Sequence, residues 1–160
     1  MQIEMTIKGL MIDPMTNMPI IILRDEDGQR VLPIWVGVFE ANAIALQIEN
    51  VQTPRPMTHD LLKSVIETLR ATVERVVVCD LKENTFYATI HLRTDGHELL
   101  VDSRPSDAIA LALRTQTPIF VEDAVLASTR PDDAADPTDL SRLQKWLENL
   151  SDDELGKYKM

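Results

Sequence analysis

The sequence lacks several features on which common kinds of functional site depend. It has a single cysteine, Cys79, so an intrachain disulfide and a cysteine-rich metal site are both excluded. It contains no glycine-rich phosphate loop, no glycine fingerprint for dinucleotides and no Gly-x-Ser-x-Gly motif. No apolar run approaches the roughly 20 residues of a membrane helix, and the N-terminus, which carries Glu4 and no basic region, does not resemble a signal peptide. These absences predict a cytoplasmic protein without a membrane partner.

Basic charge is also scarce. The chain has 16 lysines and arginines against 26 acidic residues, a formal net charge of −10, which argues against a generally basic nucleic-acid binder. The segment from Glu122 to Met160 holds ten acidic and five basic residues, so it is the more acidic part. The first 121 residues can still present a local basic face. Charge alone therefore disfavours nucleic acid as a partner without excluding it.

What is present suits a globular protein. A chain of 160 residues with 44% hydrophobic and 26% charged residues is long enough to bury a sizeable core. We predict one domain over residues 1–127. The composition then shifts to Asp, Ala, Pro and Ser, which predicts that 128–160 is an acidic linker with a C-terminal amphipathic helix.

Hydrophobic periodicity predicts an α+β fold. Strands are expected over 2–11, 19–23, 30–36, 73–81, 85–92, 98–102 and 118–121, and helices over 38–48, from Thr58 to about 69, and over 105–115. The first three strands should form a meander, since Asp27-Gly28 fits a hairpin turn. The expected architecture is a mixed, largely antiparallel sheet flanked by about three helices, plus the peripheral C-terminal helix. Leucines and other apolar residues should form the buried stripe of the second helix: Leu61, Leu62, Val65, Ile66 and Leu69.

The stretch from Asp102 to Asp107 places several reactive and charged side chains at a predicted strand-to-helix junction. Two carboxylates, two hydroxyls and a guanidinium fall within six residues. Arg104 precedes a proline and is biased away from helical dihedrals, whereas Pro105 suits the first helical position. Asp107 then falls in the first turn, where free N–H groups favour negative charge. Compensation of the helix dipole explains Asp107 well, but it explains Asp102 and Arg104 less well.

A second loop has a similar composition. Two prolines in Thr53–Met57 exclude regular structure there, and His59 and Asp60 are expected in the first turn of the next helix, exposed beside Arg55. Glu40 is expected near the start of the helix over 38–48. If these residues converge with Asp102–Asp107, arginines and helix N-termini would bind phosphate oxygens, and carboxylates would hold Mg²⁺ or Mn²⁺. From spacing alone, a structural salt-bridge network between the two loops explains the same residues more simply.

Four separated motifs resemble the bifunctional nuclease domain family and occur in the family's order. They are Leu32-Pro33-Ile34-Trp35-Val36-Gly37 with Glu40-Ala41, Pro54–Leu62, Thr85-Phe86-Tyr87-Ala88, and Asp102–Ala108, ending at Pro118-Ile119-Phe120-Val121. The resemblance covers about residues 3–126. It implies a compact α/β domain that forms a wedge-shaped homodimer, with a groove as the suggested active site and with both DNA and RNA as substrates.

The resulting hypothesis is a nuclease that acts on DNA and RNA with little sequence preference. The expected catalytic residues are His59, Asp60, Asp102, Asp107 and Glu40, with Arg55, Arg104 and Ser106 binding the substrate. His59 would move a proton, and the acidic residues, Asp102 and Asp107 above all, would hold Mg²⁺ or Mn²⁺. The alternative is a non-catalytic regulatory or scaffold dimer that binds a small anion or a protein through its Arg-Pro loops. The net charge of −10 favours this alternative, because a sequence-indifferent nuclease gains affinity from a cationic surface.

Overall fold

A computed structural model describes residues 1–129 of the chain, which form seven strands and four helices. In chain order they are β1 (Gln2–Ile12), β2 (Pro19–Asp25), β3 (Val31–Trp35), α1 (Val38–Ile48), α2 (Thr58–Thr68), β4 (Thr72–Lys82), β5 (Thr85–Thr94), β6 (His97–Ser103), α3 (Pro105–Thr115), β7 (Ile119–Glu122) and α4 (Asp123–Ser128). None of these helices is long and apolar enough to cross a membrane. The amphipathic helix predicted within 128–160 lies outside the described residues.

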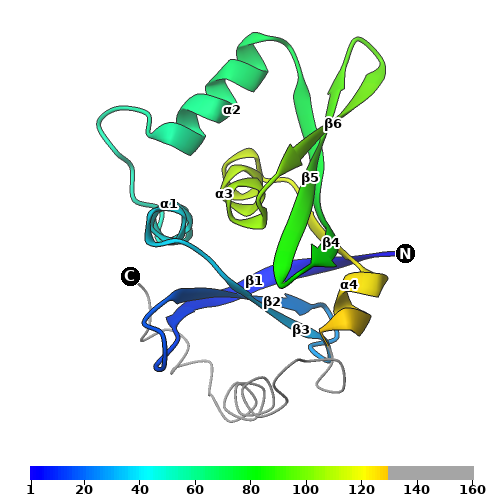
Figure 1. Cartoon of the computed structure of the whole chain (residues 1–160). Helices are drawn as coiled ribbons and strands as arrows, with labels where there is room; N and C mark the ends of the chain where they lie inside the picture. Colours follow the sequence, from blue (N-terminus) through cyan, green and yellow to red (C-terminus); the bar gives the residue numbers. More distant parts are fainter. Residues whose placement is uncertain (130–160) are drawn as a thin grey trace.

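The strands form one mixed sheet in the order β3-β2-β1-β7-β4-β5-β6. Five of its six neighbouring pairs are antiparallel, and only β4 and β7 run parallel. The predicted α+β class, with a mixed and largely antiparallel sheet, is therefore confirmed, as is the opening meander of β1, β2 and β3. Figure 1 shows this meander crossing below α1, α2 and α3 while β4, β5 and β6 rise beside them.

The short strand β7 joins the two halves of the sheet. Its first residue, Ile119, lies opposite Met5 of β1 on one side and opposite Val76 of β4 on the other. All three side chains are buried. Four residues thus connect the N-terminal meander to the meander of β4, β5 and β6, and residues from both ends of the domain meet in one core.

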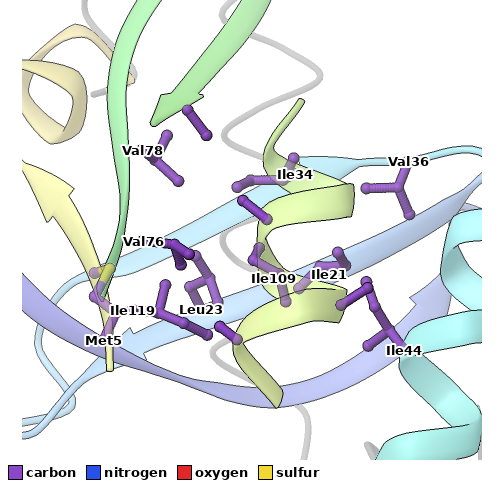
Figure 2. Packing of buried hydrophobic residues seen from close by; sticks show 14 of the residues in the cluster. Met5, Ile21, Leu23, Ile34, Val36, Ile44, Val76, Val78, Ile109 and Ile119 are labelled. Atoms are coloured by element: carbon purple, nitrogen blue, oxygen red, sulfur yellow. The ribbon is translucent and has the colours of Figure 1, made fainter. Parts of the chain in front are cut away.

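Helix α3 lies at the centre of that core (Figure 2). Its alanines at 108, 110 and 112 are buried, and side chains this small let the helix approach its neighbours closely. Ile109 is fully buried and lies among side chains such as Ile21 of β2 and Ile44 of α1. Replacing a buried isoleucine with alanine costs about 2–5 kcal/mol, so α3 is fixed firmly enough to position the residues at its N-terminus.

Helices α1 and α2 both pack against α3, but only α1 buries an apolar face. The prediction of a buried stripe on α2 is wrong for four of its five residues: Leu61 is 57% exposed and Leu69 is 71% exposed, and Leu62 and Val65 are exposed as well. Ile66 alone of the five is half-buried and packs against the core. The apolar residues do recur at helical spacing, but α2 packs mainly against α3 and stands away from the sheet (Figure 1). Within residues 1–129 no element covers the outer apolar face of α2.

Candidate active site

Helix α3 begins as its local sequence predicts. Arg104 is the N-cap residue and has extended dihedrals, φ −69° and ψ 144°, as a residue before proline prefers. Pro105 then occupies the first helical turn, and Asp107 is the acidic residue of that turn. The proline thus fixes the boundary between β6 and α3, and with it the backbone positions of Arg104 and Asp107.

Side chains from the first turns of α1 and α2 meet those at the start of α3. The Arg104 Nη2 donates to Glu40 Oε1 of α1 at 2.7 Å, and the Arg104 Nε donates to Asp107 Oδ2 at 2.9 Å. The other oxygen of Asp107, Oδ1, lies 2.9 Å from His59 Nε2 of α2. We call Glu40, His59, Arg104 and Asp107 the helix-start cluster. It unites four of the eight predicted site residues in one line of hydrogen bonds.

The contacts within the cluster fix its charges. Burial acts to raise the pKa of Asp107, but hydrogen bonds from His59 and Arg104 outweigh burial, so the pKa lies below its ordinary value. The hydrogen bond to Asp107, followed by the one to Glu40, raises the pKa of Arg104. Asp107 is therefore a carboxylate at neutral pH, and the His59 nitrogen that faces it carries the hydrogen. The second nitrogen of that ring, Nδ1, has no hydrogen-bond partner among residues 1–129.

Burial of His59 corrects one sequence expectation. We expected the ring to be exposed beside Arg55, yet His59 is a buried residue, with only 9% of its surface exposed. The cause is the packing of α2 on α3, which brings the first turn of α2 onto Asp107. Arg55, by contrast, is exposed and lines a groove of about 390 Å³ together with Asp60 and Arg114.

Asp60 has a structural partner of its own. Its Oδ1 accepts from Arg114 Nε at 2.8 Å, and its Oδ2 accepts from the backbone N–H of Met57 at 3.0 Å. Arg114 is buried and also donates to the carbonyl oxygens of Ala110 and Ala43, both at 2.9 Å. Burial acts to raise the pKa of Asp60, but the bonds from Met57 and Arg114 prevail and lower it. The pair ties α2 to α3 and α1, and it leaves neither oxygen of Asp60 unpartnered.

The remaining predicted residues lie at different distances from the cluster. Ser106 is buried next to it in the sequence, whereas Asp102 is exposed on β6, opposite Thr89 of β5. Among residues 1–129, Asp102 takes part in no side-chain hydrogen bond or ion pair. The structure therefore groups Asp107 with Glu40 and His59, and leaves Asp102 apart from them.

The acidic residues do not form a ready metal site. No group of three or more His, Cys, Asp and Glu side chains within residues 1–129 is arranged to hold a metal ion. Asp107 and Asp60 use both of their oxygens on protein donors, and Glu40 uses one on Arg104. The assignment of Mg²⁺ or Mn²⁺ to Asp102 and Asp107 stays a prediction.

Sequence reasoning missed a cavity beside the cluster. A cavity of about 260 Å³ lies between the end of β3, the turn from β4 to β5 and the start of α3, and its lining includes Trp35, Phe86, Arg104 and Ser106. The motifs that contain Trp35 and Phe86 were noted only as marks of the family. Both residues line this cavity although four strands separate β3 from β5 in the sheet, and no local pattern encodes such an arrangement.

Comparison with known proteins gives this geometry a context. The bifunctional nuclease domain family matches residues 21–133, well over half of the chain. An uncharacterized protein of Mycobacterium tuberculosis (strain H37Rv) is 37% identical over 161 residues, which cover 94% of this chain and 96% of that protein. Bifunctional nuclease 2 of Oryza sativa subsp. japonica is 32% identical over 114 residues, 69% of this chain but 35% of the plant protein. Bifunctional nuclease 1 of the same plant is 30% identical over 105 residues, 63% of this chain and 32% of its own length.

Proposed function

We propose, from the premise that the chain belongs to the bifunctional nuclease domain family, that it hydrolyses phosphodiester bonds of DNA and RNA with little sequence preference. The observation that carries the proposal is the hydrogen bond between His59 and Asp107 beside an exposed arginine. The plant relatives named as bifunctional nucleases support it, although the chain spans only about a third of each.

In this proposal His59 is the acid–base group. The ionised Asp107 accepts a hydrogen bond from the Nε2–H group, which leaves the lone pair of Nδ1 free to take a proton from an attacking water. The same carboxylate stabilises the imidazolium that then forms. The imidazolium can next donate its Nδ1 proton to the leaving oxygen. A proton thus passes from the nucleophile to the leaving group through one ring.

Arg104 would bind the phosphate. Its Nε and Nη2 are engaged by Asp107 and Glu40, but Nη1 has no partner among residues 1–129, and the side chain is 65% exposed. Two N–H groups therefore remain for phosphate oxygens, for which the planar guanidinium is well suited. Glu40 and Asp107 hold the guanidinium in one orientation. Arg55, exposed over the neighbouring groove, would add a second positive charge for the nucleic-acid backbone.

We also propose a homodimer that forms through β6. This strand ends the sheet of the described residues, and every residue from His97 to Asp102 is exposed. Its centre carries three consecutive apolar residues, Leu99, Leu100 and Val101, and an edge of this kind is a template for pairing with another strand. Antiparallel pairing of β6 with β6 of a second copy would satisfy the backbone groups of both copies and cover the same side chains on each.

The decisive experiment is cleavage of labelled single-stranded RNA and double-stranded DNA by highly purified chain, with Mg²⁺, with Mn²⁺ and with EDTA. His59→Gln removes the proposed acid–base group, and the double variant Asp102→Asn/Asp107→Asn tests the predicted metal residues. Met15→Gln, at an exposed residue of the turn between β1 and β2 and outside the cluster, is the control. We expect activity in the parent and in the control, and its loss in His59→Gln. Equal activity in all four proteins would mean a contaminant or a site elsewhere.

The second candidate is the non-catalytic regulatory or scaffold dimer. Its support is that Asp60 and Asp107 are fully engaged by protein donors, as in a structural network. The same assay separates the two candidates, because a binding module would show no cleavage by the parent with either metal or with EDTA.

A further inference from the structure

The meander of β1, β2 and β3 has an apolar face on the side away from α3. Five residues share this face, because paired residues of neighbouring strands lie on the same side of a sheet and successive residues alternate between its sides. They are Met11, Ile20, Ile22, Pro33 and Trp35. None of them belongs to the hydrophobic cluster around α3, which contains the intervening residues Ile21 and Ile34. We call this surface the far face.

The centre of the far face is covered. Met11 and Ile22 are each only 1% exposed, although Ile22 is paired with Gly9, which has no side chain, on one side and with Pro33 on the other. A strand with one side in water alternates between apolar and polar residues, whereas a strand that is buried on both sides is a continuous apolar run. Residues 20–23 of β2 are such a run, and all four are buried. A further layer must therefore lie on the far face.

Trp35 supplies one part of that layer. Its Nε1 donates to Asp13 Oδ2 at 2.9 Å, and because β2 lies between β3 and β1, this bond holds the indole across β2 at the level of Ile20. Ile22 lies about 7 Å further along β2, in the direction away from Asp13. The indole therefore does not account for the burial of Ile22.

The four helices of residues 1–129 do not supply the rest of the layer. Helices α1, α2 and α3 lie on the opposite side of the meander (Figure 1). Helix α4 packs mainly on β4 and β7, and its Val125 and Leu126 belong to the cluster around α3. The rest of the layer has to be sought in residues 130–160, which follow α4.

Helix α4 begins next to the meander. The backbone N–H of Asp123, its first residue, donates to the carbonyl oxygen of Met1 at 2.9 Å, and the Asp123 carboxylate lies 3.5 Å from Arg30, which precedes β3. Residues 130–137 can extend over at most about 29 Å, which exceeds the roughly 10 Å across three adjacent strands. The chain that follows α4 is therefore long enough to reach β2.

The sequence of residues 138–150 suits an apolar surface. Its apolar side chains recur at helical spacing, at Leu140, Leu143, Trp146, Leu147 and Leu150. A helix of this length would be about 20 Å long, enough to cross three strands, and it would be too short to be stable alone in water. Such a helix and the far face could each bury the apolar surface of the other.

We propose that residues 138–150 form an amphipathic helix that packs on the far face through its leucines and Trp146. The meander then lies between two helical layers, with α1 and α3 on one side and this helix on the other. Ile22 and Met11 lie beneath the helix, which explains their burial. The inference is independent of the proposed nuclease, because the helix-start cluster comes from α1, α2 and the start of α3 and not from the meander.

The segment lies outside the part of the chain that matches the family. That match ends at residue 133, whereas the protein of Mycobacterium tuberculosis aligns over 94% of this chain, so most residues after 133 have a counterpart in it. We therefore expect the same docked helix in that relative. Family members without the segment need another cover for the far face.

Hydrogen exchange of the full chain, followed by mass spectrometry, is the first test. Amides of residues 138–150 should exchange at least about 10-fold more slowly than those of a free peptide of the same sequence. Leu143→Asp places a charge in the apolar stripe and should remove this protection. Ser141→Asp adds the same charge on the opposite side of the helix and should leave the protection in place. Unprotected amides in the parent would overturn the proposal.

Two adjacent isoleucines of β2 then identify the surface on which the helix packs. Ile22→Ala shortens a side chain of the far face, and Ile21→Ala removes the same atoms from the cluster around α3. Urea unfolding measures each effect in the parent and in the Leu143→Asp background. The rise in the unfolding constant caused by Ile22→Ala should be about 2- to 150-fold smaller in that background, the range for residues in contact. The effect of Ile21→Ala should be equal in both.

Other arrangements would give different results. Equal effects of Ile22→Ala in the two backgrounds, together with protected amides in 138–150, would mean that the helix packs elsewhere, for example on the exposed face of α2. Protection that increases with protein concentration would mean that the helix packs on a second copy. Either result would overturn the proposal. If Leu143→Asp does not fold, Leu143→Ala takes its place in the same comparison, because it shortens one side chain and leaves the rest of the stripe.

Discussion

His59 and Asp107 stand 48 positions apart in the sequence, and their side chains meet at 2.9 Å between Nε2 and Oδ1. The contact joins the first turn of α2 to the first turn of α3. The carboxylate is thereby held between a histidine and the guanidinium of Arg104.

Removing the ring should abolish most of the cleavage. General acid–base catalysis contributes about 100- to 10,000-fold, so we expect His59→Gln to lower kcat by that range with little change in KM. Asp107→Asn should cause a loss of similar size, because an amide can turn its N–H toward the ring and stabilise the wrong tautomer. Steady-state kinetics on a labelled oligonucleotide measure both. A variant pair whose defect lies only in KM would contradict the acid–base role.

The stability contributed by Asp107 should depend on acid pH. Because its pKa in the folded protein is lowered, its ionised contacts stabilise the fold above the unfolded value, about 3.9, and that stability is lost as the pH falls through the folded pKa. Urea unfolding of the parent and of Asp107→Asn, from pH 7 down to about pH 3, measures the difference. We expect the difference in urea midpoint between the parent and Asp107→Asn to become smaller as the pH is lowered. A gap that stays constant would mean that the carboxylate contributes no linked stabilisation.

Asp60 should matter for stability more than for chemistry. Asp60→Asn removes the charge that balances the buried Arg114, and leaving such a charge unpaired costs about 3 kcal/mol or more. The double variant Asp60→Asn/Arg114→Met removes both charges and should recover much of that loss. Urea unfolding at pH 7 gives each value. Cleavage by the folded fraction of Asp60→Asn should be close to that of the parent, and a loss of activity at full stability would instead support the predicted catalytic role of Asp60.

Gly37→Ala should disturb the cluster without removing any of its charges. A Cβ at Gly37 would clash with Glu40 Oε2, so the carboxylate must move, whereas the φ of −70° suits alanine. The displaced Glu40 no longer orients Arg104, and we expect a fall in cleavage of roughly 10- to 100-fold, the scale of small misplacements in active sites. Glu40→Ala should show a similar fall, and the double variant should fall no further. Additive losses would show that Gly37 acts through another contact.

The proposed dimer depends on the exposed centre of β6. Leu100 is 63% exposed, and a lysine on an edge strand blocks pairing with another strand. Leu100→Lys should therefore be monomeric in analytical ultracentrifugation, at concentrations where the parent is dimeric. Met15→Lys, at an exposed residue of the turn between β1 and β2, is the control and should stay dimeric. A parent that is monomeric at all concentrations would reject the interface.

Local chemistry made much of the fold predictable from the sequence. The proline after Arg104 and the acidic residue in the next turn fix the start of α3, and the structure places that start at Pro105. The meander of β1, β2 and β3 follows from short turns, and the family resemblance is confirmed by the match over residues 21–133. Each of these features depends on residues that are close together in the sequence.

Features that depend on distant residues were harder to predict. The periodicity of Leu61 and Leu69 indicates an apolar face on α2, but it does not tell which surface covers that face, and in residues 1–129 it is exposed. The burial of His59 needs Asp107 as a partner. The cavity at the start of α3 needs the end of β3 and the start of β5 to lie near each other, although four strands separate β3 from β5 in the sheet. Helical spacing and strand alternation carry none of this information.

The four residues of β7 also determine when the sheet can be completed during synthesis of the chain. Ribosomes add about 5–20 residues per second, so the interval between the synthesis of β1 and that of β7 is roughly 5–20 s. The inner edge of β1 has backbone groups without its later partner strand for all of that time, and the inner edge of β4 for about the last third of it. The nascent domain is therefore open to wrong strand pairing until Ile119–Glu122 leaves the exit tunnel. A chaperone that shields those edges would matter most for nascent chains on ribosomes that stall before this segment.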